Sequence, residues 1–229
     1  MILGGEKMKT KRNIIIVIIV LVCGLMSVVD AVIQPGYFIK SLIKITLFLL
    51  CPLIYSFYDK ECNLKKLFIP DKKGILTALS LGVGVYAVVV GAYFAFRGIF
   101  DFSALTSSLT STTGVNKNNF IFVAVYISFA NSLLEEFFFR GFAFLTLKGV
   151  SNRVLAYVVS STFFAVYHIA MMIGWFAWPV ILLSMIGLFV GGVIFDFMNE
   201  KYNNIYLSWL IHMFANFATN TIGFILFSI

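Results

Sequence analysis

The sequence predicts an all-α fold, a polytopic membrane helix bundle of about seven transmembrane helices, and three observations support this prediction. Of the 229 residues, 61% are hydrophobic and only 12% are charged, whereas a soluble domain is about half apolar and about a quarter charged. Apolar runs of about twenty residues, long enough to cross a bilayer as a helix, recur along the chain. These runs are continuous rather than alternating, which excludes a transmembrane β-barrel. The composition also excludes a soluble domain, a disordered chain and a disulfide scaffold.

The first half of the chain carries three predicted spans. A basic tail precedes an apolar run at residues 14–29. No small-x-small cleavage site follows the run, so we expect an uncleaved first span rather than a signal peptide. The second predicted span covers residues 38–57, with Lys40 and Lys44 at its outer end, and the third covers residues 74–96.

The second half begins with a connection rich in Ser, Thr and Asn at residues 97–119, in which we expect an interfacial segment at residues 100–109. Four predicted spans follow, at residues 120–148, 152–172, 178–197 and 205–227. The connection could add or remove one span, so the expected total is six to eight. We expect one membrane domain with two regions, residues 1–119 and residues 120–229.

The Lys and Arg residues predict the orientation in the membrane. The formal net charge is +7, and the cations lie in short loops, where they orient a membrane protein rather than bind nucleic acid. A cytoplasmic amino terminus puts most of them inside, including those of residues 58–73, and leaves the carboxyl terminus outside. The composition, rich in Lys, Ile, Phe and Asn, suggests an AT-rich bacterial genome and hence a bacterial plasma membrane.

The fourth apolar run contains charged residues that need an explanation. Glu135, Glu136 and Arg140 lie within it, flanked by Phe and Leu, although a charge at the centre of a bilayer costs about 2.5–3.5 kcal/mol. Glu136 and Arg140 are four residues apart and share a helical face. Glu135 projects about 100° away from Glu136. The simplest assignment pairs Glu136 with Arg140 and leaves Glu135 free to face another helix.

The two histidines of the chain also lie in apolar runs. In a hairpin of the fourth and fifth spans, Glu135 and His168 lie at similar depth, within about one helical turn. His212 and Asn216 are four residues apart and project from one face of the last span. A lone histidine in an apolar helix is usually a hydrogen-bonded core residue. A purely structural role does not account for all of these polar groups together, so we expect them to converge on a polar cavity inside the membrane.

Three motifs resemble those of a known family. Glu135-Glu136-x-x-x-Arg140, Phe164-x-x-x-His168 and His212-x-x-x-Asn216 follow one another on successive apolar runs. In this order they are similar to the motifs of the CAAX-protease and bacteriocin-processing family of intramembrane proteases, also called the Abi or type II CAAX prenyl endopeptidase family. The resemblance covers roughly residues 120–217. It implies that residues 120–229 form the catalytic core.

The resemblance implies an intramembrane endopeptidase that cleaves a peptide bond in a membrane-associated peptide or protein. Peptide hydrolysis needs an activated water and a stabiliser for the oxyanion. Glu135, desolvated among apolar residues, suits the general base, and His168 can share its water and later donate a proton. His212 and Asn216 suit the oxyanion. Glu136, Arg140 and Phe164 are then expected to support these catalytic residues.

Several alternatives stay open at this point. Glu135, His168 and His212 could instead bind a zinc ion with one open position, although a glutamate mechanism without metal or other cofactor is favoured. A non-enzymatic bacteriocin self-immunity or scaffold protein of the same fold is a second function, and a proton-coupled transporter is a third. The implied substrates are leader or pheromone peptides rather than prenylated proteins.

Two further features of the sixth predicted span have structural interpretations. Gly187, Gly191 and Gly192 are expected to form a small-residue face for close helix packing. Asp196 is expected at a cytoplasmic helix end, with its carboxylate extended toward water.

Overall fold

The computed structural model describes residues 2–69, 71–99, 102–173 and 177–229, and the regular structure of these residues is entirely helical. Seven of the described helices are long and apolar enough to cross a membrane. They are Gly5–Ile33, Tyr37–Tyr58, Ile75–Phe96, Phe120–Val150, Arg153–Met172, Trp178–Tyr202 and Ile205–Phe227. The predicted all-α class and the predicted number of spans are therefore confirmed.

Four spans are regular along their length, and three contain π-helical turns. The regular helices are α4 (Ile75–Phe96), α9 (Arg153–Met172), α10 (Trp178–Tyr202) and α11 (Ile205–Phe227). The first span is α1 (Ile2–Val28) with a π turn at Val29–Ile33, and the second joins α2 (Tyr37–Ile45) to α3 (Cys51–Tyr58) through a π turn at Thr46–Leu50. The fourth consists of α6 (Phe120–Tyr126), a π turn at Ile127–Asn131, α7 (Ser132–Glu136), a π segment at Phe137–Thr146 and α8 (Leu147–Val150).

Two connections are themselves partly helical. A 3-10 turn at Leu64–Phe68 lies in the loop after the second span. The predicted interfacial segment at residues 100–109 corresponds in part to α5 (Ser103–Ser108) and a π turn at Leu109–Thr113. Its first two residues, 100 and 101, lie outside the described part of the chain.

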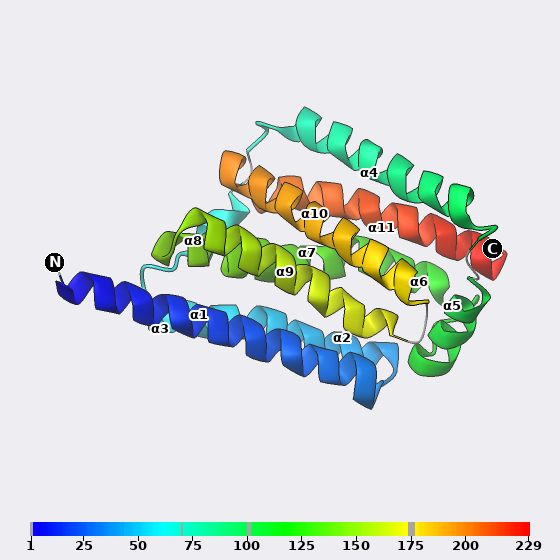
Figure 1. Cartoon of the computed structure of the whole chain (residues 1–229), viewed down its shortest axis with the longest axis horizontal. Helices are drawn as coiled ribbons and strands as arrows, with labels where there is room; N and C mark the ends of the chain where they lie inside the picture. Colours follow the sequence, from blue (N-terminus) through cyan, green and yellow to red (C-terminus); the bar gives the residue numbers. More distant parts are fainter. Residues whose placement is uncertain (1, 70, 100–101, 174–176) are drawn as a thin grey trace.

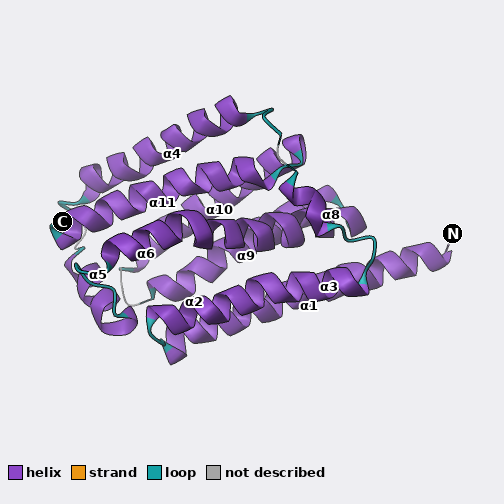
Figure 2. Ribbon diagram, turned by 180° about the vertical axis from the view of Figure 1, so that it is seen from behind, coloured by secondary structure: helices purple, strands orange, loops and turns teal. Residues whose placement is uncertain are grey.

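The helices form a layered bundle. α1 runs beside the second span along one side of the bundle, and α4 lies at the opposite edge against α11 (Figure 1). α9 packs against both α1 and α10, and the fourth span lies in the interior, between the second span and α11 (Figure 2). The fourth span is consequently covered by protein on several sides, so it is the span best suited to carry buried charges.

Aromatic side chains fill the core around the fourth span. Phe48 stacks on Phe138 with ring centroids 4.4 Å apart, and its ring also lies 5.3 Å from that of Tyr167. Phe139 contacts Phe164 of α9 at 5.3 Å. Such ring pairs add about 0.5–1.5 kcal/mol beyond the area they bury. They fix the second, fourth and fifth spans against one another, and these are the spans that enclose the polar groups.

One of the three glycines on α10 accounts for its close approach to α9. A Cβ on Gly192 would lie 3.0 Å from the Ser161 backbone, whereas no described residue lies within 4 Å of the Cβ positions of Gly187 and Gly191. The expectation of a three-glycine packing face is therefore wrong for Gly187 and Gly191. The spacing of the glycines does not show which of them faces a neighbouring helix.

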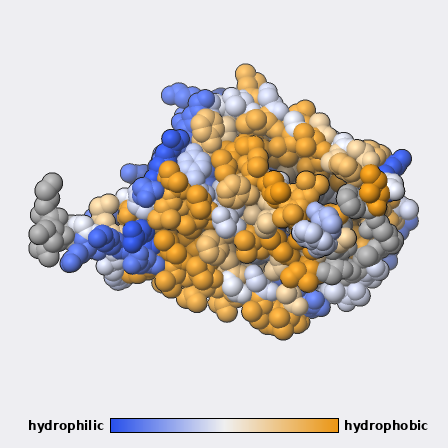
Figure 3. All heavy atoms as spheres, in the orientation of Figure 1, coloured by the Kyte–Doolittle hydropathy of each residue, from blue (hydrophilic) through white to orange (hydrophobic). Residues whose placement is uncertain are grey.

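The surface has an apolar belt and a polar end. Large apolar side chains are exposed over the visible face, and hydrophilic residues gather where the amino terminus lies (Figure 3). At that end Lys11 pairs with Asp59 at 2.8 Å, and Arg153 pairs with Glu200 at 2.8 Å. The amino-terminal tail, the loop after the second span and the α8–α9 turn thus gather at one end of the bundle (Figure 1). Which side of the membrane this end faces stays a prediction.

Candidate active site

Glu135 lies at the centre of the polar groups, near the middle of the fourth span. It is 15 residues before Val150, and His168 is 15 residues after Arg153, so both lie about 22 Å from the α8–α9 turn. Glu135 Oε2 is 3.5 Å from His168 Nε2 and 3.6 Å from His212 Nε2. The hairpin therefore brings Glu135 and His168 to the same depth, as the sequence predicted, and the last span adds His212.

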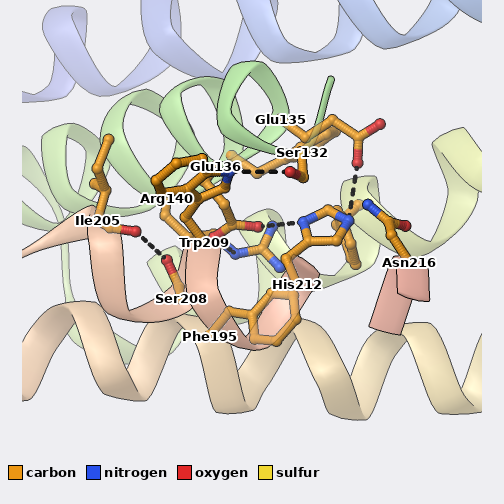
Figure 4. A network of polar contacts seen from close by, with 12 residues as sticks. Ser132, Glu135, Glu136, Arg140, Phe195, Ile205, Ser208, Trp209, His212 and Asn216 are labelled. Atoms are coloured by element: carbon orange, nitrogen blue, oxygen red, sulfur yellow. Dashed lines mark hydrogen bonds and ion pairs between the residues drawn. The ribbon is translucent and has the colours of Figure 1, made fainter. Parts of the chain in front are cut away.

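The two imidazole rings are oriented by hydrogen bonds at their other nitrogens. His168 Nδ1 donates to the Phe164 backbone carbonyl at 2.7 Å. His212 Nδ1 is 2.9 Å from Glu136 Oε1, within hydrogen-bond distance (Figure 4). Because Nδ1 is engaged in each ring, both Nε2 atoms face Glu135. The neutral His168 tautomer then presents an unprotonated Nε2, which can accept a proton.

The two adjacent glutamates have different surroundings. Glu136 is fully buried, and its Oε2 lies 3.4 Å from Arg140 Nε, the i,i+4 partner that the sequence predicted. Glu135 has no cation on its own helix within one turn. Its Oε1 instead contacts Lys44 Nζ and accepts a 3.0 Å hydrogen bond from Asn131 Nδ2.

Arg140 has a second counter-charge, Asp196, which was expected at a helix end. Asp196 Oδ1 lies 3.7 Å from Arg140 Nε, and Asp196 accepts hydrogen bonds of 3.0 and 3.1 Å from Ser160 and Ser161. The guanidinium also lies 4.1 Å from the centroid of the Phe164 ring, so a cation–π contact adds to its ion pairs.

The expectation that Asp196 extends toward water at a helix end is therefore wrong. α10 continues to Tyr202 rather than ending at residue 197. Asp196 consequently lies more than a turn inside the helix, and α9 covers it, so it is completely buried. The predicted span ended at residue 197, one position after Asp196.

α11 is fixed to the fourth span by side chains that donate to backbone carbonyls. Asn216 Nδ2 donates to the Ile127 carbonyl at 3.0 Å, and Asn220 Nδ2 donates to the Ala124 carbonyl at 3.1 Å. Trp209 Nε1 donates to the Phe129 carbonyl at 3.0 Å. Two of these acceptors lie in the π turn at Ile127–Asn131, and π turns often occur at functional sites.

Asn216 is thus close to the site, but its side chain already donates a hydrogen bond to the Ile127 carbonyl. Its carboxamide lies one turn from His212 on the same helix, beside the imidazole in Figure 4. One N–H of its amide group is used by Ile127, which leaves the second N–H for another acceptor.

Lys44 is a site residue that lies deeper in the bundle than its sequence position predicts. It was expected at the outer end of the second span, but it is buried, with a side-chain exposure of 5%. It lies 14 residues before the end of its span at Tyr58, which is nearly the distance of Glu135 from Val150. Counting residues from the end of the helix, which predicts that Glu135 and His168 lie at the same depth, therefore places Lys44 at nearly that depth too.

The residues considered for zinc do not form a recognisable metal site. Among the described residues, no group of three or more His, Cys, Asp or Glu side chains is arranged to hold a metal ion. Glu135 has an ammonium group, that of Lys44, as its closest positive partner. The site thus holds the buried Glu135 Oε2 between the imidazoles of His168 and His212. The amide of Asn216 and the carboxylate of Glu136 lie beside them.

Comparison with known families agrees with the motifs. Residues 117–218 match the family model described as Rce1-like, type II CAAX prenyl endopeptidase. This match confirms the predicted family resemblance, and the matched residues include Glu135, His168, His212 and Asn216 but not Lys44. No curated protein matches the chain, and no solved structure matches it.

Proposed function

Since residues 117–218 match the Rce1-like family of type II CAAX prenyl endopeptidases, we propose that the chain is an intramembrane endopeptidase that uses Glu135 to activate water. The substrate is a membrane-associated peptide or protein, and the membrane is a bacterial plasma membrane. One observation carries the proposal: Glu135 Oε2 is buried, faces both imidazoles, and has no hydrogen-bond partner among the described residues. An acceptor held in this way is suited to take a proton.

The proposed reaction begins with proton transfer from water to Glu135. The resulting hydroxide attacks the carbonyl carbon of the scissile bond and forms a tetrahedral oxyanion. His212 lies between Glu135 and Glu136, 3.6 and 2.9 Å away, so it can donate from both ring nitrogens. We assign the oxyanion to His212 Nε2–H and to the N–H of Asn216 that Ile127 leaves unused.

The second half of the reaction breaks the carbon–nitrogen bond. The proton held by Glu135 passes through His168 to the leaving nitrogen as the tetrahedral intermediate collapses. A carboxylic acid and an amine are released, and Glu135 returns to its ionised form. His168 is more exposed than Glu135, with 16% of its side chain accessible against 2%, so the substrate is expected to approach from the side of His168.

A mechanism without metal is favoured over a zinc mechanism. A zinc ion would use Glu135, His168 and His212, and it would polarise the scissile carbonyl. The Lys44 ammonium already neutralises Glu135, so the carboxylate does not need a metal as its charge partner.

The proposal is tested with the full-length protein reconstituted in liposomes. Two sets of synthetic peptides are offered, one ending in a prenylated cysteine and one with the sequences of hydrophobic leader peptides, and products are identified by mass spectrometry. We expect cleavage in at least one set and its loss in His168→Ala. Tyr86→Phe is the matched control, because its hydroxyl contacts Thr221 in the α4–α11 contact and not the site. Cleavage by His168→Ala at the rate of the control would contradict the assigned mechanism.

A further inference from the structure

Lys44 brings a positive charge into the site from outside the family-matched part of the chain. It is the one buried residue of α2, whose residues are all described. Every other position on that helix is at least partly exposed, so the one fully buried side chain of α2 carries an ammonium. A cation at this depth is strongly unfavourable without partners, so its partners indicate its role.

The partners of Lys44 hold its ammonium at one point. Nζ contacts Glu135 Oε1 and donates to Asn131 Oδ1 at 2.6 Å. Nζ also lies 5.4 Å from the centroid of the Phe48 ring and 5.0 Å from that of Tyr167. Two oxygens and two aromatic faces therefore surround the charge, and cation–π contacts of this kind strengthen in a desolvated site.

This arrangement gives the two oxygens of Glu135 different tasks. Oε1 is occupied by Lys44 Nζ and by Asn131 Nδ2. Oε2 is left facing the two imidazoles. If Oε1 were released, the carboxylate could rotate about its last bond and present either oxygen to the site.

We propose that Lys44 is a positioning residue of the active site, which orients Glu135 so that Oε2 faces His168 and His212. This inference rests on the proposed peptidase function. It also extends the active site into the second span, which lies outside residues 117–218. Lys44 acts through Glu135 and does not touch the substrate.

The same helix provides a matched control. Lys40 lies one turn before Lys44, and its Nζ is 2.5 Å from Asp30 Oδ1 of the first span. This pair is also largely buried, with side-chain exposures of 13% and 0%. Loss of Lys40 therefore removes a buried ion pair of α2 without touching Glu135.

The first experiment compares Lys44→Met with Lys40→Met in the peptide cleavage assay. We expect kcat of Lys44→Met to fall about 100-fold with KM nearly unchanged, because misplacing a catalytic group by about 1 Å has an effect of this order. Lys40→Met should keep the kcat of the unmodified protein. Methylammonium should restore part of the activity of Lys44→Ala, in which it can occupy the place of the missing ammonium. Equal kcat values for Lys44→Met and Lys40→Met would overturn the proposal.

The second experiment does not depend on a substrate. The thermal stabilities of Lys44→Met, Glu135→Gln and the double variant form a double-mutant cycle. We expect Lys44→Met to lower the melting temperature and Glu135→Gln to restore most of it, because the double variant leaves no unpaired buried charge. If the two substitutions are coupled in stability but the unmodified protein cleaves no peptide, the peptidase function alone is refuted. Absence of coupling would refute the role of Lys44 alone.

Discussion

Changing Glu136 to Gln separates the structural and catalytic contributions of the second glutamate. Glu136 has no exposed surface, and its two oxygens serve different groups, His212 Nδ1 at 2.9 Å and Arg140 Nε at 3.4 Å. Glutamine has nearly the same volume, so the substitution creates no cavity. It removes the negative charge and leaves an amide that can still accept from one partner.

The expected loss of stability follows from what remains around Arg140. Removing one partner of a buried ion pair usually costs about 3–5 kcal/mol. Asp196 remains 3.7 Å from Arg140, so a counter-charge is kept, and we expect a smaller loss of about 2 kcal/mol, the order of one charge-assisted hydrogen bond such as that between Glu136 Oε1 and His212 Nδ1. For a chain of this size, that corresponds to a drop of roughly 4–8 °C in the melting temperature.

The expected loss of activity follows from His212. Without the Glu136 carboxylate, the Nδ1–H of His212 has a weaker acceptor and the ring loses its fixed orientation. Removing the hydrogen-bond partner of a metal-bound histidine lowers activity by about 10–100-fold, and we expect an effect of the same order at His212. The assay measures kcat of the purified variant at a temperature where it is fully folded.

Asp196→Asn is the matched control for this prediction. It removes the other counter-charge of Arg140 but leaves His212 untouched, so it should lose comparable stability and keep most of its kcat. If both variants lose stability and keep the same kcat, Glu136 has no catalytic contribution. If Glu136→Gln is stable but inert while Glu135→Gln keeps its kcat, the roles of the two glutamates are reversed.

Three further predictions concern the topology, the need for a metal and the Lys11–Asp59 ion pair. A reporter that is active only in the cytoplasm, fused after Ile229, should be silent, and an active fusion would reverse the predicted topology. Cleavage should survive treatment with EDTA and 1,10-phenanthroline, whereas loss of activity that zinc restores would favour the metal mechanism. Burial alone would raise the pKa of Asp59, but hydrogen bonds, chiefly from Lys11, outweigh it and hold the pKa below its usual value. The difference in melting temperature between the unmodified protein and Asp59→Asn should therefore be full at neutral pH, begin to shrink as the pH falls below about 4, and vanish only below the lowered pKa of Asp59; a difference independent of pH would contradict this.

The parts of the site that the sequence predicted depend on local geometry. Glu136 and Arg140 pair because they are four residues apart on one helix. Glu135 and His168 reach the same depth because a short turn joins their helices, so counting residues from the turn is sufficient. These inferences need only the helical rise and the hairpin connection.

The parts that it missed depend on contacts between distant segments. Lys44 and Glu135 are 91 positions apart, and a lysine near the beginning of a span is normally an interfacial residue. Asp196 was misplaced because the predicted span ended one residue after it, whereas Ser160 and Ser161 supply its partners on another helix. The π turn that presents the Ile127 carbonyl to Asn216 has no recognisable sequence signal.

The role of Glu135 as the general base is tested by the cleavage rate of Glu135→Gln in purified, reconstituted protein. Glutamine keeps the size of the side chain and can still accept from Lys44, but it cannot take a proton from water at neutral pH. We expect a folded protein with a cooperative thermal transition and with kcat reduced by about 10²–10⁴-fold, the contribution typical of a general base. A folded Glu135→Gln protein that cleaves the same peptide at the rate of the unmodified protein would contradict the claim that Glu135 activates the water.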